Sequence, residues 1–467
     1  MSDRKKVIVF LCTDYMGVAN QIAELSDSIS SLDTHLVVVT DHVDTTSMLQ
    51  SSNVLFRRTN IIFMGNDSEL FESLADIKAR EIVCNHFDIN NSYANLLSVD
   101  YDRFDTLGLT SPASSLLGSA FLEFVNMFQY LHANFEVIAS FSEGPHNFFL
   151  RSYDAYRDGT RRHGRYIYLR PGRVGDSFYL QDADSKVTVL KDSGSDTIAD
   201  DVSPFYMSED APLMRSISWK IRNSDKTSLY YALSKIWRTK SIRLNFFDKP
   251  NVISLILALW LRELRSYYVT ISGGTNKFIS EDIPPGKIVV YPEHYHPEAS
   301  TSAYDFTLRN DYENAIRIRK ALPEEYTLLY KLHPSNKNRH PTGMLHKISK
   351  LPGVLLVEKS LDIRCRTPAF VLISVSSTMI LDYVENDKPA LVIGSPEFCS
   401  DTHLKSRLLK TSIEKFEQNP TALIGEAVER AKNSEAKFSR AMLVGSLYTP
   451  KRDLVSIISK LVEAHTK

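Results

Sequence analysis

The chain is poor in cysteine, and the cysteines it has form no motif. Cys12, Cys84, Cys365 and Cys399 are the only four in 467 residues, and none stands in a Cys-x-x-Cys pair. Zinc sites and disulfide frameworks need cysteines at close and regular spacings. The scattered pattern argues against both and is typical of a reducing compartment, so we expect a cytoplasmic protein.

An excess of charge of one sign is also lacking. The 55 Lys and Arg residues nearly balance the 56 Asp and Glu residues, which gives a formal net charge of −1. Nucleic-acid-binding domains are usually strongly basic, so we expect no nucleic-acid partner. An anionic ligand would be held by a local site rather than by the field of the whole protein.

Long hydrophobic runs are missing as well. The most apolar segment, 252–260, is soon followed by Arg262, Glu263 and Arg265, and it is far shorter than the ~20 residues of a membrane-spanning helix. The basic N-terminus lacks the apolar region and cleavage site of a signal peptide. The segment 230–247 mixes basic and aromatic residues, which suits either a solvated helix face or a membrane surface. We therefore expect any membrane contact to be peripheral, at the inner face of the plasma membrane.

The composition is otherwise that of a soluble protein, 43% hydrophobic and 24% charged, in a chain long enough for two or three domains. Short apolar runs alternate with helical patterns, which predicts α/β domains with parallel sheets. In the first half we expect strands at 7–12, 35–40, 61–64, 81–84, 135–140 and 167–169 and helices at 18–29 and 114–131. In the second half we expect strands at 287–291, 327–330, 353–357, 370–373 and 389–393 and helices at 311–321, 344–350, 419–432 and 451–465.

These elements predict a domain scheme. An N-terminal domain covers residues 1–250 and includes a polar excursion at about 183–250. A linker helix region at 251–285, a C-terminal domain at 286–450 and a final helix at 451–467 follow. The first βα turn holds a single glycine, so the dinucleotide-binding fingerprint is missing.

A lysine and a histidine stand at a predicted strand end in the C-terminal domain. Lys331, His333 and Pro334 follow the strand 327–330. Proline disfavours a helical conformation in the residue before it, so His333 should lie in extended backbone. In open α/β sheets, ligands bind at the carboxyl ends of the strands. The histidine is therefore a candidate ligand-binding residue.

A hydroxyl-rich turn occupies the equivalent position after the strand 370–373. Ser374, Ser376, Ser377 and Thr378 precede a helical pattern there. Ser376 or Ser377 is placed to cap this helix, and the N–H groups at a helix start favour an anion. A histidine and a hydroxyl-rich turn at two strand ends together predict a phosphate-binding site.

The N-terminal half offers a candidate base. Glu143 and His146 fall in the predicted βα loop after strand 135–140, where a carboxylate is suited to take a proton from a sugar hydroxyl. Alternatively, Glu143 caps the next helix, since acids favour its first turn, and His146 only bonds within the loop. Arg170 and Arg173 follow the strand 167–169. They would contact an anionic group of the acceptor or donor, or else form ion pairs.

Three ordered motifs within 289–395 can be compared with a known family. They are Tyr-Pro-Glu-His-Tyr-His-Pro-Glu-Ala-Ser-Thr-Ser at 291–302, Leu-Tyr-Lys-Leu-His-Pro at 329–334, and Ser-Val-Ser-Ser-Thr-Met-Ile-Leu-Asp-Tyr at 374–383 with Lys-Pro-Ala-Leu-Val-Ile-Gly at 388–394. The set resembles bacterial capsule polysaccharide biosynthesis glycosyltransferases, a group that includes Kdo transferases. Bacterial sialyltransferases and teichoic-acid glycerophosphotransferases also carry a His-Pro unit and a serine-rich unit, so the motifs do not identify the donor. The N-terminal half is similar only loosely, through Glu143-Gly144 and the helical segment 155–164.

The resemblance implies a GT-B fold, in which two Rossmann-like domains with parallel sheets face each other across a cleft. The N-terminal domain would hold the acceptor and the C-terminal domain the nucleotide sugar. By the same resemblance, His333, Ser376 and Ser377 would contact the donor phosphate. Further residues would line the donor site: Glu293, His296, Glu298, Lys331 and Thr378. Leu332 stands where many relatives have an acidic residue, and this departure bears on the role of Lys331.

The residues and the resemblance together predict a metal-independent enzyme. A leaving phosphate gains charge that an imidazole and hydroxyl donors would stabilise, so we take Glu143 and His333 as the catalytic pair. Asp182 and Asp184 form an Asp-x-Asp sequence, but we place it in the polar excursion rather than at a strand end. The His-rich segment 293–296 suits hydrogen bonding better than metal binding. We expect no metal and no cofactor besides the nucleotide-sugar substrate.

The expected reaction is transfer of a sugar from a nucleotide-activated donor, such as a CMP-linked acid sugar like Kdo, to a cell-surface polysaccharide or glycolipid. Other enzymes of polysaccharide assembly are expected partners. Three alternatives stay open: a CDP-polyol phosphotransferase of the teichoic-acid type, a nucleotide-sugar 2-epimerase, and a non-catalytic GT-B module that binds glycan. The joint presence of a histidine, hydroxyls and a candidate base argues against the last of these.

Overall fold

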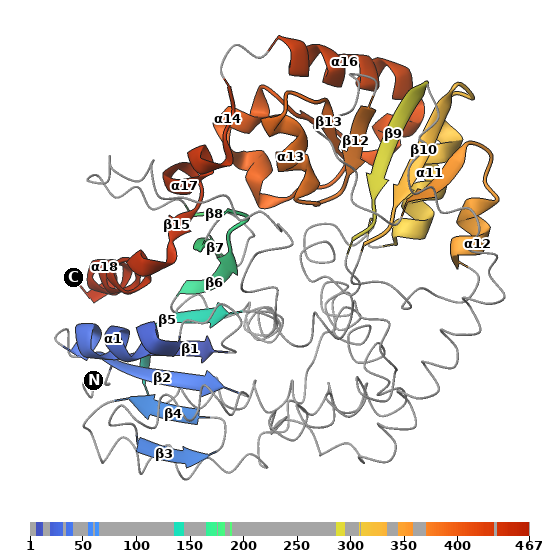
Figure 1. The fold of residues 1–467 in the computed structure, drawn as a ribbon. Coiled ribbons are helices and arrows are strands. Elements are labelled where there is room, and N and C mark those ends of the chain that lie inside the picture. Colours follow the sequence, from blue (N-terminus) through green and yellow to red (C-terminus); the bar gives the residue numbers. More distant parts are fainter. Residues whose placement is uncertain are drawn as a thin grey trace, which may run out of the picture.

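Two β-sheets, each formed mainly by one half of the chain, make up the described fold (Figure 1). The structure is a computed structural model. It describes residues 6–12, 19–30, 34–40, 55–58, 61–64, 135–143, 165–174, 176–182, 187–188, 286–294, 308, 310–333, 344–357, 370–433 and 437–466. The two mainly parallel sheets with their helices confirm the predicted α/β fold class.

The first sheet has a parallel centre and antiparallel edges. The centre, in the order β6-β5-β1-β2, contains β1 (Lys6–Cys12), β2 (Thr34–Thr40), β5 (Glu136–Glu143) and β6 (Arg165–Pro171). Four consecutive apolar residues of β1, at 7–10, are fully buried, because a central parallel strand is covered on both faces. At one edge β4 (Ile61–Met64) pairs with β2, and β3 (Leu55–Arg58) pairs with β4. At the other edge β7 (Ser177–Asp182) pairs with β6, and β8 (Val187–Thr188) and β15 (Thr449–Pro450) pair with β7.

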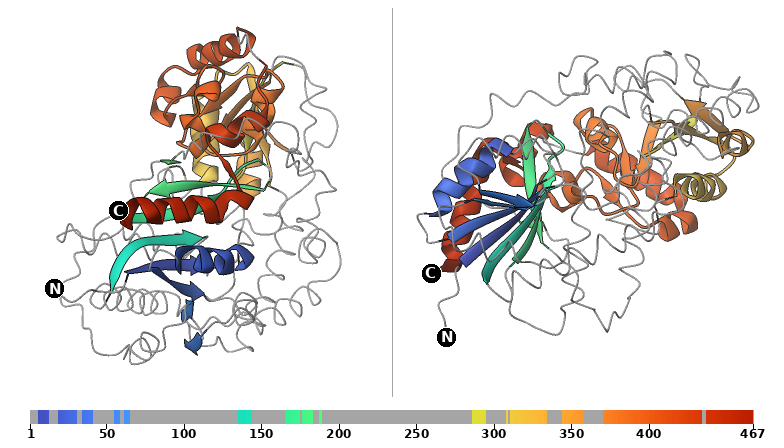
Figure 2. Two further views of the ribbon diagram at one scale, coloured as in Figure 1. Left: turned by 90° about the vertical axis from the view of Figure 1, so that its left-hand side faces the viewer. Right: turned by 90° about the horizontal axis from the view of Figure 1, so that it is seen from below.

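The C-terminal end of the chain packs on this first sheet. After β15 come η6 (Lys451–Asp453) and α18 (Leu454–Thr466), and α18 lies beside α1 (Ala19–Ser30) (Figure 2). The hydroxyl oxygens of Ser28 and Ser459 are 2.8 Å apart, although 431 residues separate them in sequence. Apolar residues at helical spacing on the two helices share one core: Leu454, Ile457, Ile458 and Val462 of α18, and Ile22, Leu25 and Ile29 of α1. The first and last parts of the chain therefore fold as one unit.

The second sheet is parallel throughout its described strands. In the order β11-β10-β9-β12-β13-β14 it contains β9 (Lys287–Pro292), β10 (Tyr326–Lys331), β11 (Val354–Val357), β12 (Phe370–Ser374), β13 (Ala390–Val392) and β14 (Leu409–Lys410). Numbered along the chain, these strands follow the Rossmann order 3-2-1-4-5-6. The winding direction reverses between β9 and β12, and this switch point is where such sheets bind ligands.

Helices pack on both faces of the second sheet. One face carries α11 (Asp311–Ala321), α12 (Met344–Ser349), α15 (Ile413–Gln418) and α16 (Pro420–Lys432). The other carries α13 (Met379–Glu385), η4 (Glu397–Ser400), α14 (Thr402–Lys405) and α17 (Leu443–Ser446), the last preceded by η5 (Arg440–Met442). The start of α11 is well defined because the side chain of Asn310 accepts the N–H groups of Tyr312 and Glu313.

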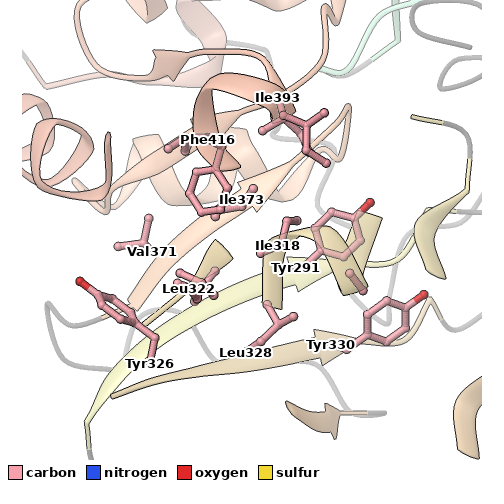
Figure 3. Packing of buried hydrophobic residues seen from close by; sticks show 14 of the residues in the cluster. Tyr291, Ile318, Leu322, Tyr326, Leu328, Tyr330, Val371, Ile373, Ile393 and Phe416 are labelled. Atoms are coloured by element: carbon pink, nitrogen blue, oxygen red, sulfur yellow. The ribbon is translucent and has the colours of Figure 1, made fainter. Parts of the chain in front are cut away.

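Residues of β9 and β10 pack beneath α11 in one hydrophobic core (Figure 3). Tyr291 of β9 and Tyr330 of β10 are fully buried, and their rings stack with centroids 6.0 Å apart. Val289 and Leu328 lie on the same face of the sheet as these tyrosines, two positions earlier in each strand. This packing fixes the carboxyl ends of β9 and β10 relative to each other.

A buried contact joins the second sheet's core to the β6–β7 hairpin of the first. Val174 and Tyr179 of the hairpin pack in one cluster with Tyr448, and the rings of Tyr179 and Tyr448 lie 5.9 Å apart. In Figure 1 the arrowheads of β1 and β5 point right, and that of β9 points down, towards the middle of the picture.

Within the described residues, no helix is sufficiently long and apolar to cross a membrane.

Most predicted elements within the described residues form close to their expected bounds, and two predictions need correction. Strand β5 continues to Glu143, beyond the expected end at 140, because β1 and β6 pair with it on both sides. The strand β7 is not among the predicted strands, and it includes Asp182, so the prediction that Asp182 lies in a polar excursion is wrong. The predicted strand 81–84, the helix 114–131, the linker 251–285 and most of the excursion lie outside the described residues.

Candidate functional site

Three chain segments meet at the carboxyl edge of the second sheet, around the switch point. They follow β10, β9 and β12, which are neighbours in this order. The N–H of Glu293 donates to the carbonyl oxygen of Lys331 over 2.8 Å. The N–H of Ser376 donates to Nε2 of His294 over 3.1 Å. The fold therefore brings the predicted lysine, histidine and serine units to one place.

Glu293 lies under His333 and holds its backbone. The Glu293 side chain is buried, and its Oε2 accepts the N–H of His333 over 2.8 Å. A charge-assisted hydrogen bond of this kind is stronger than one between neutral groups. The half-buried His333 is thereby fixed in backbone position at the end of β10. Glu293, predicted to line the donor pocket, is a supporting residue for the histidine in this structure.

A buried polar network, centred on Asp311, supports the loop after β9. Asp311 accepts the hydroxyl of Tyr291 over 2.6 Å and the backbone N–H of His294 over 2.8 Å. The ring Nδ1 of His294 lies 2.9 Å from the same carboxylate. Burial, together with the charge of Asp311, raises the pKa of Tyr291 well above its ordinary value. The tyrosine therefore stays a hydrogen-bond donor at any physiological pH.

Sequence reasoning missed His294 as a functional residue. It belongs to the His-rich segment 293–296, in which the family resemblance points to Glu293 and His296 instead. The signal that could have found it was its position, directly after a strand that would be buried on both faces. The sequence pattern marks Asp311 only as the start of a helix, and nothing in the sequence pairs it with His294.

The hydroxyl-rich turn after β12 is held by its own side chains. Oγ of Ser374 accepts the N–H of Ser377 over 3.1 Å, and Oγ of Ser377 accepts the N–H of Met379 over 3.3 Å. The prediction that Ser376 or Ser377 caps this helix is wrong, because the N-cap of α13 is Thr378. Ser377 precedes the cap and accepts the first N–H of the helix, whereas the N–H of the buried Ser376 bonds to His294. Thr378 is the exposed N-cap residue and makes no side-chain cap bond.

Gly394 allows the end of β13 to approach this turn closely. A Cβ at this position would lie 2.7 Å from both the carbonyl oxygen and Cγ1 of Val375. A contact that short with a backbone oxygen does not accommodate a side chain, so only glycine fits here without moving the turn. The glycine that ends the 388–394 motif therefore has a packing role behind the serine turn.

Lys331 is a partly buried cation between two carboxylates. Burial lowers its pKa below the ordinary value of 10.5, and this effect outweighs the opposing attraction of Glu293 and Asp382. Asp382, one turn into α13, is paired with Arg440, whose Nε also contacts Oε2 of Glu385 at 2.9 Å. A lysine in this setting offers positive charge to an anion at the edge of the sheet.

Nucleotide binding should weaken with alkaline pH when Lys331 loses its proton. The ammonium is present below its lowered pKa and is lost as the pH rises through that value, so affinity should fall several-fold before the pH reaches 10.5, the ordinary pKa of a lysine. In Lys331→Arg the guanidinium stays charged over this range, and titration calorimetry should show a nearly constant Kd. If the Kd rises equally with pH in the wild type and in Lys331→Arg, Lys331 does not contribute to nucleotide binding.

The first sheet places Glu143 at the edge where ligands bind in such sheets. It is the last residue of β5, the strand between β1 and β6, and it pairs in register with Leu169. All three strands are parallel, so their carboxyl ends lie at one edge. Asp182 ends β7, which is antiparallel to β6, and it lies towards the opposite edge.

The two predicted arginines have partners within the protein. Nε of Arg170 donates to Oε1 of Gln181 over 3.4 Å, and its guanidinium lies 5.9 Å from the ring centre of Tyr168. Arg173 pairs with the buried Glu397 at 2.8 Å, so the ion-pair alternative describes it. Of the remaining candidates, His146, His296 and Glu298 lie outside the described residues.

The part of the chain that the structure describes contains no group of three His, Cys, Asp or Glu side chains placed to hold a metal ion.

No protein-family model matches the sequence, and no curated protein matches it.

Some solved structures are similar to this chain. One is KpsC of Thermosulfurimonas dismutans, a beta Kdo 2,7 transferase, at 11% identity over 72% of this chain and 88% of that one, with a TM-score of 0.33. Another is the UDP-GlcNAc 2-epimerase of Neisseria meningitidis bound to UDP-GlcNAc, at 12% identity over 97% and 100%, with a TM-score of 0.28. A third is S. aureus MnaA with UDP, at 13% identity over 99% and 98%, with a TM-score of 0.30. Likeness this remote says nothing about the reaction.

Proposed function

We propose that this protein is a glycosyltransferase that binds a nucleotide-activated sugar at the carboxyl edge of its second sheet. The observation that carries the proposal is the meeting of His333, Lys331 and the 374–378 turn at the switch point of a parallel sheet with Rossmann order. Switch points bind nucleotides because the loops on either side diverge and leave backbone groups exposed to a ligand. The resemblance of the three motifs to capsule polysaccharide glycosyltransferases supports the same function.

The chemistry fits departure of a phosphate. Breaking the bond between a sugar and a nucleotide puts negative charge on the leaving phosphate oxygen. His333 and the ammonium of Lys331, with the hydroxyl groups of the turn, would stabilise that charge where it develops. Because these groups are already held by Glu293 and by the turn's own hydrogen bonds, little reorganisation is needed during the reaction.

The acceptor would bind against the first sheet. Glu143 would take the proton from an acceptor hydroxyl as the new bond to the sugar forms. We propose a cell-surface polysaccharide or glycolipid as the acceptor, an acid sugar such as Kdo as the donor sugar, and catalysis without a metal ion. A transferase that attacks phosphorus instead of the anomeric carbon would give an acceptor product that contains phosphorus.

A thermal-shift screen against CMP, CDP, UDP, GDP and ADP tests the proposal. A nucleotide at about 100 times its Kd should stabilise the native protein by about 2.7 kcal/mol. The stabilisation should disappear in Thr378→Trp, which fills the space beside the turn, and persist in Thr421→Trp. Both threonines are exposed, and Thr421 lies on α16, away from the turn.

The nucleotide that stabilises the protein identifies the donor class. CMP would indicate an acid sugar, CDP a polyol phosphate, and UDP or GDP a common hexose. Mass spectrometry of the acceptor after reaction then distinguishes sugar transfer from transfer of a polyol phosphate. Absence of stabilisation by all five nucleotides, or equal stabilisation of both tryptophan variants, would contradict the proposed site.

A further inference from the structure

His294 links the core of the second sheet to the serine turn across the switch point. Its side chain is 1% exposed. On one side, Nδ1 lies 2.9 Å from Oδ1 of Asp311. On the other side, Nε2 lies 3.1 Å from the backbone nitrogen of Ser376. The imidazole therefore spans from the start of α11 to the loop after β12.

The partners of His294 determine its tautomer. The backbone N–H of Ser376 is a donor, so Nε2 must present a lone pair to accept it. The ring proton then belongs on Nδ1, from which it is donated to the carboxylate of Asp311. The imidazole is neutral in this arrangement and uses both nitrogens. A buried ring in this state is not placed to exchange protons with a substrate, and its chemistry is that of a fixed acceptor.

The ring of His294 is held in place by a network of buried hydrogen bonds around Asp311. Asp311 also accepts the hydroxyl of Tyr291 and the backbone N–H of His294. The amide of Asn314 donates to the hydroxyl of Tyr291 over 3.1 Å and to the carbonyl oxygen of Leu308 over 2.7 Å. All of these side chains are buried, and buried networks with every member bonded hold their groups in one geometry.

The Ser376 N–H depends on an acceptor because it is buried. Leaving a buried N–H without a partner is costly, so a turn that loses this acceptor is expected to shift until the group finds another one. The turn has little room to shift without consequence, because Gly394 packs against Val375 behind it. A shift would also move Ser377 and Thr378, the residues that follow.

We propose that His294 is a positioning residue, which sets the serine turn so that Ser377 and Thr378 meet the donor phosphate. The inference rests on the proposed function of this site. It gives a role to His294, for which the family resemblance implies none. His294 acts through the backbone of Ser376 and does not touch the donor.

Two substitutions of His294 test the roles of Nδ1 and Nε2 separately. In His294→Gln, the longer side chain brings an amide oxygen near the place of Nε2, so the acceptor for Ser376 is kept. In His294→Asn, the amide nitrogen lies near the place of Nδ1 and can donate to Asp311, but the side chain is too short to reach Ser376. Each variant loses one hydrogen bond of the same buried residue, so urea unfolding should show similar destabilisation of the two.

The nucleotide that stabilises the wild-type protein serves as the probe. We expect its Kd to rise about tenfold in His294→Asn, the loss of roughly one well-placed hydrogen bond, and to stay within about threefold of the wild-type value in His294→Gln. A purely structural role would instead weaken binding equally in the two variants, and that result would overturn the proposal.

Hydrogen exchange of the Ser376 amide provides a second readout that needs no ligand. In the ligand-free protein, this amide should exchange slowly in the wild type and in His294→Gln, and faster in His294→Asn. Equal exchange in all three would overturn the positioning role. If the wild-type protein binds none of the five nucleotides, the proposed function fails, while the exchange rates still decide whether His294 holds the turn.

Discussion

Replacing Glu143 by Gln is expected to lower kcat for sugar transfer by about 10²–10⁴-fold, the usual contribution of general-base catalysis. Glutamine has nearly the same size as glutamate but cannot take a proton from an acceptor hydroxyl. Glu143 ends β5 at the carboxyl edge of the first sheet, on a different sheet from the proposed donor site. The Kd for nucleotide should therefore stay at its wild-type value.

The same strand offers a matched control for this prediction. Glu136 is the first residue of β5, is exposed, and lies at the opposite edge of the sheet. Steady-state kinetics of Glu136→Gln should be those of the wild type. Wild-type turnover in Glu143→Gln would exclude it as the base, and equal losses in both variants would indicate damage to the strand rather than loss of a base.

The strand and helix pattern of the second half was readable from the sequence because local signals and burial agree there. The run 327–330 is apolar on both faces of the sheet, and Asn310 with the acids at 311 and 313 marks a helix start. The predicted helix 311–321 matches α11 at both ends. Short or polar elements gave weaker signals, and β7, β14, α14 and α15 were not predicted.

The order of the strands could not be derived from such signals. Nothing in the residues of β12 states that it pairs with β9 and not with β11. The pairing follows from how crossovers of the whole chain pack, a property of tertiary structure. For the same reason, the sequence does not predict that β15 joins the first sheet or that α18 packs on it.

The candidate site was also predictable from the sequence only in part. Residues at strand ends were found because position alone marks them, as for His333 and the serine turn. The partners of these residues were not found, because each bond joins distant segments: Glu293 to His333 across 40 positions, and His294 to Ser376 across 82. The sequence therefore predicts groups at the strand ends, including Glu293, but not the hydrogen bonds by which Glu293 and His294 hold the other groups.

Replacing His333 by Ala is expected to lower kcat by about 10²–10³-fold, the effect of removing one donor that stabilises developing charge. His333 lies at the end of β10 with its backbone fixed by the carboxylate of Glu293. Alanine keeps the backbone N–H and this hydrogen bond, so the variant removes the imidazole alone. His346→Ala, which alters an exposed histidine of α12, should behave as the wild type.

The division of the loss between kcat and KM tests where the imidazole acts. A group that contacts the phosphate equally before and during bond breaking would raise KM and leave kcat unchanged. A group that meets charge only as the bond breaks would lower kcat and kcat/KM by the same factor. We expect mainly the second pattern, because the charge on the phosphate increases as it leaves. A change in KM alone would assign His333 to donor binding and require another group to stabilise the leaving phosphate.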